Sequence, residues 1–461
     1  MRRIGKRAWV LLLLILVLAG GTALYVRDYA RNAHSWVMHP GNGHIYQGSQ
    51  QLPARGSVVD REGMCLLQLQ PQRSYGEDPM VRMSTLHWLG DRAGNIQAPA
   101  LAHYQSQLSG YDDLNGLYSY SGTGGVMTLT LSHSVQQAAL EALGAYKGTV
   151  AVYNYKTGEL LCAVSTPTFD PDHVPDIAGQ PDLYDGVYLN RFTQGVYIPG
   201  SIFKVVTTAA ALEHADTIAH ERFQCTGVLE FGTDKVTCEI PHGTLDLKTA
   251  MQRSCNCAYA QVAMLLGQEV LLDYAARFGV LDKLQFDGIT TAQGSIDRTE
   301  LAPVELAWTA IGQHKDQINP CTFLTFIGAV AAGGQGVSPY VVSSISQDGA
   351  PVYVASIEQR QRIMSTETAL QLQQYMRNNV VNNYGDSHFP GLTVCAKSGT
   401  GEVDGDQLSY AMFTGFTMDE AYPLAFIVAV EDAGYGKTVC VPILAQVLAA
   451  CKEMMDAETV S

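Results

Sequence analysis

The stretch YIPGSIFKVVTTAAAL, residues 197–212, places a serine and a lysine three positions apart at the start of an apolar run. Pro199 and Gly200 end an extended segment, so the run is predicted to be a helix on which Ser201 and Lys204 share one face. A lysine in an apolar pocket loses solvation of its charged form, so its pKa falls and it can take a proton from a nearby hydroxyl. The N–H of Ser201 at a helix start can also stabilise an oxyanion. Taken alone, the same residues are better explained by an N-capping serine and a lysine that extends to solvent.

Two later stretches favour the catalytic interpretation of Ser201 and Lys204 over the structural one. SCN at residues 254–256 stands at a predicted turn before an apolar helix, where a second hydroxyl can relay a proton and an amide can hold a peptide carbonyl. KSGT at residues 397–400 follows the strand-like LTVCA. A glycine on such a strand lets a substrate backbone approach closely, and the lysine and the hydroxyls supply donors for a carboxylate. Each stretch alone is explained by an ordinary cap or turn, but the three in the order S-x-x-K, S-x-N, K-[ST]-G form a specific combination.

This motif set resembles that of the penicillin-binding proteins and serine β-lactamases. ARGSVVDREG at residues 54–63 is similar to the R-G-x-x-x-D-R-x-G box of class B penicillin-binding proteins. The resemblance extends over residues 50–445 with a few gaps, and includes the segments 155–172, 190–204 and 334–342. Two departures stand out: Ser398 replaces the threonine of many relatives, and LTLS at residues 129–132 replaces the family's L-T-I-D.

The resemblance implies a peptidoglycan D,D-transpeptidase. Ser201 would attack the penultimate D-Ala carbonyl of a stem peptide ending in D-Ala-D-Ala, Lys204 would be its general base, and Ser254 would pass a proton to the leaving amine. β-Lactams would acylate the same serine. No metal or organic cofactor would be required, and a membrane glycosyltransferase of the division or elongation machinery is an expected partner. The implied substrate-binding residues are Asn256 for the peptide backbone and Lys397, Ser398, Gly399 and Thr400 for the terminal carboxylate and the oxyanion.

Other functions remain open from the residues. A membrane-anchored β-lactamase would share the acylation step, but class A enzymes need a positioned glutamate for deacylation, and no E-x-x-L-N stretch lies between the second and third motifs. A non-catalytic β-lactam sensor or scaffold would tolerate a broken motif set, whereas all three motifs are intact. The formal net charge of −15 and the lack of a basic stripe argue against nucleic-acid binding.

The N-terminal segment predicts a membrane anchor. AWVLLLLILVLAGGTALYV at residues 8–26 is uncharged and follows four basic residues, and a helix of that length spans roughly 28 Å. The basic cluster predicts that residues 1–7 are cytoplasmic and that the remainder of the chain is extracytoplasmic. A cleaved signal peptide ending near residues 21–23 is the alternative. No other stretch is expected to be long and apolar enough to cross a membrane.

The remaining pattern is typical of an α/β (α+β) protein with an antiparallel sheet flanked by helices, as in the penicillin-binding and serine β-lactamase-like transpeptidase domain. Residues 27–125 show weak periodicity and are predicted to be a small irregular head or linker that contains the R-G-x-x-x-D-R-x-G box. Residues 126–455 are predicted to be the transpeptidase domain. Strands are predicted at 126–131, at 148–165 as a pair joined by a turn, at 410–417 and at 423–432, with helices at 133–146 and about 440–455.

The ten cysteines are scattered, without C-x-x-C pairs or a Cys/His grouping at zinc-ligand spacing, so no zinc site is expected. Cys225 and Cys238 flank a predicted hairpin and are predicted to form a disulfide outside the cell. Cys255, inside the second motif, is predicted to be a small filler.

Overall fold

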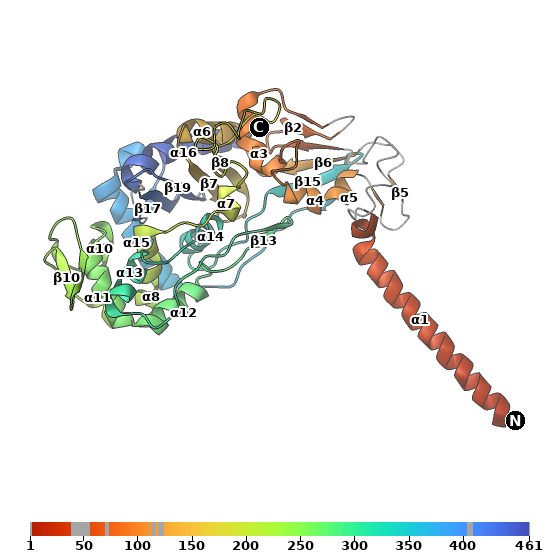
Figure 1. Ribbon diagram of the computed structural model, residues 1–461, viewed down its shortest axis with the longest axis horizontal. Coiled ribbons are helices and arrows are strands. Elements are labelled where there is room, and N and C mark those ends of the chain that lie inside the picture. Colours follow the sequence, from red (N-terminus) through yellow and green to blue (C-terminus); the bar gives the residue numbers. More distant parts are fainter. Residues whose placement is uncertain are drawn as a thin grey trace.

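The computed structural model describes residues 2–37, 56–69, 73–109, 111–112, 117–118, 124–402 and 409–460. Figure 1 shows a long N-terminal helix, α1 (Arg2–Val37), and a folded body built on two larger sheets and several helices. The central sheet is antiparallel throughout. Its strands, in order, are β17 (Val394–Gly401), β18 (Tyr410–Thr417), β19 (Leu424–Val430), β7 (Gly148–Asn154) and β8 (Leu160–Thr166).

Helices cover both faces of the central sheet, which confirms the predicted fold class (Figure 1). On one face lie α6 (His133–Leu143) and α16 (Gly436–Val460), and α14 (Pro320–Ala331) packs on the other. Strand β7 contributes buried side chains to both helical layers, because alternate side chains of a strand point to opposite faces of the sheet. Val150 and Val152 pack with α6 and α16, whereas Ala151 and Tyr153 join the core on the α14 side.

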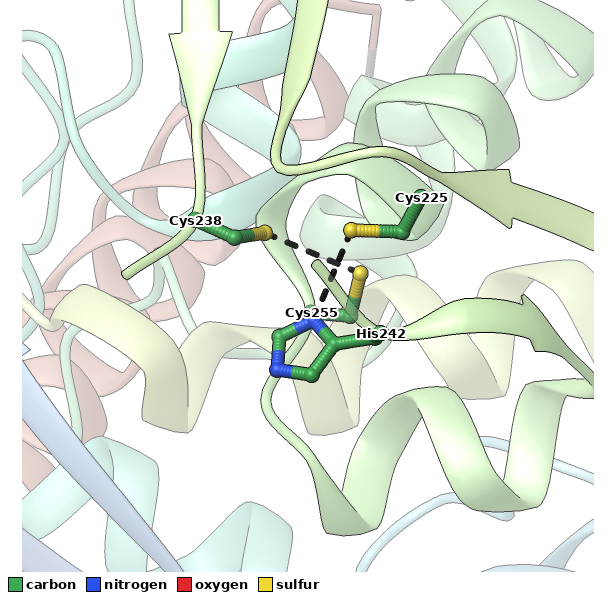
Figure 2. A group of neighbouring side chains, drawn as sticks. All are labelled: Cys225, Cys238, His242 and Cys255. Carbon is green, nitrogen blue, oxygen red and sulfur yellow. Dashed lines mark hydrogen bonds between the residues drawn. The ribbon is translucent and has the colours of Figure 1, made fainter. Parts of the chain in front are cut away.

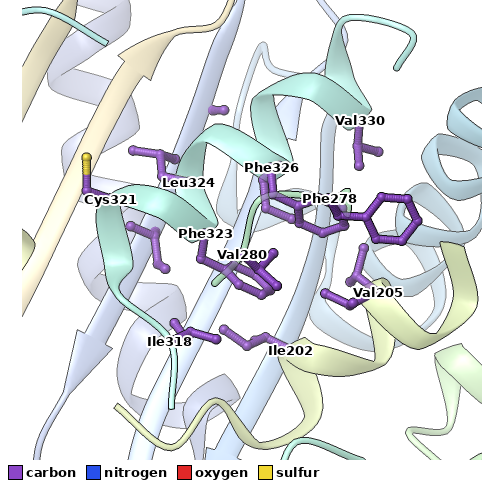
Figure 3. Close-up of a cluster of buried hydrophobic side chains, with 14 of the residues drawn as sticks. Ile202, Val205, Phe278, Val280, Ile318, Cys321, Phe323, Leu324, Phe326 and Val330 are labelled. Carbon is purple, nitrogen blue, oxygen red and sulfur yellow. The ribbon is translucent and has the colours of Figure 1, made fainter. Parts of the chain in front are cut away.

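A helical layer on the α14 side completes the body. It includes α8 (Lys204–His214), α10 (Leu247–Gln252), α11 (Asn256–Leu266), α12 (Gln268–Arg277), α13 (Pro303–Ile311) and α15 (Thr366–Asn379). Figure 3 shows Ile202 and Val205, at the start of the α8 segment, packed with Phe323 and Phe326 of α14. The first motif is therefore fixed to the central layer of the protein by apolar contacts.

The second sheet joins segments that the sequence assigned to different regions. Its order is β16 (Ala350–Val354), β15 (Val342–Gln347), β6 (Gly125–Leu129), β1 (Gly56–Val59), β2 (Cys65–Gln68) and β3 (Ser74–Tyr75), and only β1 and β6 are parallel neighbours. The strand expected at 126–131 is confirmed as β6, but it belongs to this sheet and not to the central one.

Part of the head region is regular, although it was expected to be irregular. Helix α3 (Pro79–Leu89) begins with Asp78 as N-cap and carries Trp88, whose indole N–H donates to Ala163 O of β8 at 2.7 Å. Two short helices follow, α4 (Pro99–His103) and α5 (Gln105–Ser109). The weak periodicity is explained by burial on most sides of α3, which leaves no polar stripe for the sequence to reveal.

The turn after β1 ties the head to the body. The carboxylate of Asp60, fully buried, accepts from the His133 backbone N–H at 2.8 Å and lies 2.6 Å from His133 Nδ1. Arg61 Nε donates to Glu458 Oε1 of α16 at 2.7 Å. Ser132, which stands where the family has aspartate, caps α6 by accepting from the Val135 N–H.

Within the part of the chain that the structure describes, two helices are long and apolar enough to span a membrane. The segment Arg7–Tyr29 of α1 has a mean hydropathy of 2.4 and none of it is buried. The segment Gly436–Thr459 of α16 has a mean hydropathy of 1.4, so the expectation of a single such stretch was wrong. Because α16 packs on the sheet, its apolar face belongs to the core of the body.

Candidate active site

Ser201 lies in a short 3-10 turn, η2 (Gly200–Phe203), that leads directly into α8. Lys204 Nζ lies 3.1 Å from Ser201 Oγ, as the predicted shared helical face requires. Lys204 is fully buried, and no side chain caps the start of η2. The alternative of an N-capping serine and a solvent-reaching lysine is therefore wrong.

Backbone packing at Gly200 joins the first motif to the third. Gly200 has a φ of +53°, and a Cβ there would lie 2.2 Å from Thr400 O. On its other side, a Cβ at Gly312 would lie 2.2 Å from Gly200 O. Only residues without a side chain allow these three segments to approach so closely.

The ammonium group of Lys204 meets the second motif. Its Nζ donates to Ser254 O at 2.7 Å, to Ser254 Oγ at 3.2 Å and to Asn256 Oδ1 at 2.8 Å. Burial lowers the pKa of Lys204 to about 7, because the charged form loses its hydration. Near neutral pH a large share of Lys204 is then unprotonated and able to accept the Ser201 proton.

The turn between α10 and α11 holds the second motif in place. The N–H of Ser254 donates to Met251 O and the N–H of Cys255 donates to Ala250 O, at 3.1 and 3.0 Å. These are the two bonds of a Schellman helix ending, whose left-handed position usually carries glycine. Ser254 occupies that position with a φ of +51°. The unusual conformation aims its carbonyl and hydroxyl at Lys204.

The third motif lies on β17, at the edge of the central sheet. Lys397 Nζ donates to Ser254 Oγ at 3.0 Å and to Ser398 O at 2.7 Å. Burial, and next the nearby charge of Lys204, hold the pKa of Lys397 well below its usual range. The Ser254 hydroxyl is thus shared by two buried lysines, so a proton can pass among these three side chains.

Two further residues of the third motif, Ser398 and Thr400, are partly accessible. Ser398 and Thr400 are half-buried and alternate with the buried Lys397 and Gly399 along β17. A Cβ at Gly399 would lie 2.7 Å from Pro199 O, so the glycine permits the turn of the first motif to pack against the strand. The partial exposure of Ser398 and Thr400 leaves part of each residue accessible from solvent.

Two supporting residues were missed by the sequence reasoning. Tyr384, at the end of the helical turn η3 (Val380–Tyr384), accepts from the Ser398 N–H at 2.9 Å and lies 3.0 Å from Ser398 Oγ. Gln313 Nε2 donates to Thr400 O at 3.0 Å. Neither residue belongs to a spaced motif, and no signal in the sequence connects either one to β17.

A cluster of sulfur and imidazole groups lies directly behind the second motif. Figure 2 shows Cys225, Cys238, His242 and Cys255 turned toward a common centre, and their potential ligand atoms all lie within 4.8 Å of one another. Cys225 and Cys238 are free thiols, so the predicted disulfide between them is wrong. Cys255 is more than a filler, because its sulfur accepts from the Ala258 N–H as N-cap of α11.

The assembled groups suit acyl transfer through a serine ester. A hydroxyl lies within hydrogen-bond reach of a buried lysine of lowered pKa, which is the arrangement of a nucleophile and its base. A second hydroxyl bridges this base to another lysine, and a half-exposed strand edge with hydroxyl groups lies alongside.

Comparisons with known proteins agree with this arrangement. The family described as "Penicillin binding protein transpeptidase domain" matches residues 148–449. Peptidoglycan D,D-transpeptidase PbpA of Mycobacterium tuberculosis is 28% identical over 336 residues, which cover 67% of this chain and 68% of that protein. Stage V sporulation protein D of Bacillus subtilis is 29% identical over 321 residues, which cover 65% of this chain and 48% of that protein.

Solved structures give the same result. The D,D-transpeptidase domain of a peptidoglycan glycosyltransferase from Eggerthella lenta superposes with a TM-score of 0.76 at 25% identity, covering 87% of this chain and 98% of that one. The penicillin G acyl-enzyme complex of penicillin-binding protein A from M. tuberculosis superposes with a TM-score of 0.73 at 25% identity, covering 86% and 99%.

Proposed function

The chain belongs to the penicillin-binding protein transpeptidase family, and on this premise we propose that it is a peptidoglycan D,D-transpeptidase that cross-links stem peptides through an acyl-enzyme at Ser201. The observation that carries the proposal is the 3.1 Å contact between Ser201 Oγ and Lys204 Nζ, with burial lowering the pKa of Lys204 to about 7. A base with a pKa near the working pH combines a sufficient unprotonated fraction with a sufficient affinity for the proton.

The reaction proceeds in two steps, acylation of Ser201 and transfer of the acyl group to an amine. Ser201 Oγ bonds to the penultimate D-Ala carbonyl carbon while Lys204 takes the hydroxyl proton. The peptide C–N bond then breaks, and the terminal D-Ala leaves after its amine receives a proton through Ser254, whose hydroxyl lies 3.2 Å from Lys204 Nζ. The amine of a neighbouring stem peptide next attacks the ester, forms the cross-link and returns the proton to Ser201.

Substrate binding is assigned to the groups that border Ser201. Asn256 holds the peptide backbone, and Lys397, Ser398 and Thr400 receive the terminal carboxylate, with Gly399 giving the backbone room to approach. The N–H groups of Ser201 and Thr400 stabilise the oxyanion. The burial of these groups supports the assignment. Lys204 and Lys397 are buried, whereas Ser398 and Thr400, on the same strand as Lys397, are half-exposed.

The membrane arrangement is part of the proposal. Helix α1 anchors the protein, with residues 1–7 in the cytoplasm and the transpeptidase domain, residues 126–455, outside, joined through the head at 27–125. The glycan strands that carry its stem peptides are supplied by a glycosyltransferase reaction, so we assign a membrane glycosyltransferase as partner. Protease treatment of intact spheroplasts should digest the body, and digestion only after lysis would contradict this orientation.

A fluorescent penicillin tests the nucleophile. Full-length protein in detergent should be labelled covalently, and Ser201→Ala should lose all label while keeping its thermal unfolding temperature. The protein should also release D-Ala from a pentapeptide ending in D-Ala-D-Ala. Labelling that persists in Ser201→Ala would place the acyl group on another residue.

The fate of the acyl-enzyme separates this function from that of a β-lactamase. No E-x-x-L-N stretch between the second and third motifs supplies a glutamate to activate water, so water attack on the ester should be slow. The protein should take up one equivalent of penicillin and then stop. Sustained penicillin hydrolysis would move the assignment to a membrane-anchored β-lactamase.

A further inference from the structure

Four metal-binding side chains converge from four separate points of the chain. Cys225 ends β9 (Phe223–Cys225), Cys238 follows β11 (Asp234–Thr237), His242 precedes β12 (Gly243–Leu245), and Cys255 is the N-cap of α11. Their ligand atoms all lie within 4.8 Å of one another. Cys225 and Cys255 are buried, whereas Cys238 and His242 are half-buried and leave a path for an ion to enter.

Two of the spacings between these atoms match those of a tetrahedral metal site. With Zn–S bonds of about 2.3 Å, two sulfurs at the corners of a tetrahedron lie about 3.8 Å apart. A sulfur and an imidazole nitrogen on the same ion lie about 3.5 Å apart. Here Cys238 Sγ and Cys255 Sγ are 3.7 Å apart, and Cys225 Sγ and His242 Nδ1 are 3.5 Å apart. Both pairs fit edges of one coordination tetrahedron.

Backbone groups are placed to stabilise sulfur in its charged form. The N–H of Cys257 donates to Cys238 Sγ, and the N–H of Ala258 donates to Cys255 Sγ, both at 3.4 Å. Amide donors of this kind offset the negative charge of metal-bound thiolates and orient them. Cys257 Sγ also lies 3.6 Å from Cys238 Sγ, with Val236 O as a second partner at 3.8 Å, so it stands beside the four ligands.

A disulfide explains these contacts less completely. Cys238 Sγ is almost equally far from Cys255 Sγ and Cys257 Sγ, so neither pair is singled out. Any one bridge would also leave at least two other groups of the cluster, including the imidazole of His242, turned toward the same centre with no role. A metal ion uses all four groups at once.

We propose that Cys225, Cys238, His242 and Cys255 bind one structural Zn²⁺ behind the active site. Three thiolates and one imidazole in a tetrahedron are a donor set that selects zinc over the harder divalent cations. Because the protein supplies all four ligands, no coordination position is left for a water molecule, so the ion has a structural role and activates no water.

The zinc site holds the second motif in position. Cys255 lies between Ser254 and Asn256, both of which contact Lys204 Nζ. The ion fastens this turn to the hairpin of β10 (Val228–Phe231) and β11, whose Thr237 O accepts from Asn256 Nδ2 at 2.9 Å. A small two-stranded ribbon is only marginally stable by itself. Metal binding contributes free energy of folding and so stabilises such a ribbon.

Metal content tests the proposal without reference to acylation. Full-length protein purified without chelator, or reloaded with ZnSO₄ under reducing conditions, should carry about one zinc per chain, as measured by inductively coupled plasma mass spectrometry. Cys225→Ser and His242→Ala should each weaken zinc retention at least ~100-fold against a competing chelator, since loss of even an outer-shell partner costs ~10–100-fold. The matched controls Cys65→Ser and His220→Ala should keep the full metal content.

Cobalt binding provides a second test, which uses only the wild-type protein and so does not depend on whether the variants fold. Wild-type protein loaded with Co²⁺ should show the intense visible bands of a tetrahedral ion and the near-ultraviolet band of thiolate-to-cobalt charge transfer. Absence of zinc after reloading, an octahedral cobalt spectrum, or a disulfide within the cluster found by non-reducing peptide mapping would each overturn the proposal. Zinc retained in full by both ligand variants would overturn the assigned ligands.

Discussion

The second and third motifs face each other across Lys397 and Ser254, yet they are held in place by different means. The third motif is part of β17, which pairs with β18 over its whole length, from Val394 opposite Thr417 to Gly401 opposite Tyr410. The second motif lies on a single turn fixed by two helix-ending hydrogen bonds and by the side chains around Cys255. A strand in a ladder keeps its position when one side-chain contact is lost, whereas an isolated turn depends on each contact.

The largest effect is expected at Lys204, which joins the first motif to the turn. Lys204→Arg should lower the acylation rate by about 10³-fold, because arginine stays protonated and cannot accept the Ser201 proton. Stopped-flow acylation by a chromogenic β-lactam measures the rate, and circular dichroism verifies the fold. The exposed Lys156→Arg is the control and should be unchanged. Near-normal acylation by Lys204→Arg would assign the base to another group.

A pair of hydroxyl deletions compares the two regions directly. Ser254→Ala should lower the acylation rate about 10²-fold, because its hydroxyl serves both buried lysines. Tyr384→Phe removes the hydroxyl behind Ser398, but the β17–β18 ladder remains, so the loss should stay under ~10-fold, the worth of one neutral hydrogen bond. A larger effect from Tyr384→Phe than from Ser254→Ala would refute the contrast between strand and turn.

A smaller effect than that of Ser254→Ala is expected in the pH dependence of acylation. With a pKa of about 7 for Lys204, its unprotonated fraction, and with it the acylation rate, should rise about tenfold between pH 6 and pH 8 and then level off. Between about pH 7 and the ordinary lysine pKa near 10.4, the unfolded chain binds the proton more tightly, so this lysine makes the free energy of unfolding increase with pH. Acylation that stays flat from pH 6 to pH 8 would contradict the lowered pKa.

The sequence and the structure agree where the pattern is local. The strands at 148–165, 410–417 and 423–432 and the helix at 133–146 appear as β7, β8, β18, β19 and α6 because alternating or helical apolar spacing is a property of neighbouring residues. The helix α3 in the head was not foreseen, since a short helix buried on most sides has no periodic stripe. The pairing of β6 with β15 was not foreseen either, because these two strands lie more than 200 residues apart in the sequence.

The sequence by itself determined the candidate reactive groups of this protein: three short motifs whose serines, lysines and asparagine are contiguous or one helical turn apart, and a predicted anchor of contiguous apolar residues. Only the tertiary structure decided what surrounds them. Tyr384 and Gln313 reach β17, and Cys225, Cys238 and His242 reach Cys255, through packing between separate elements. Local spacing constrains groups on one turn of helix or strand, but the meeting of side chains from different elements is fixed only when those elements bury their apolar faces together.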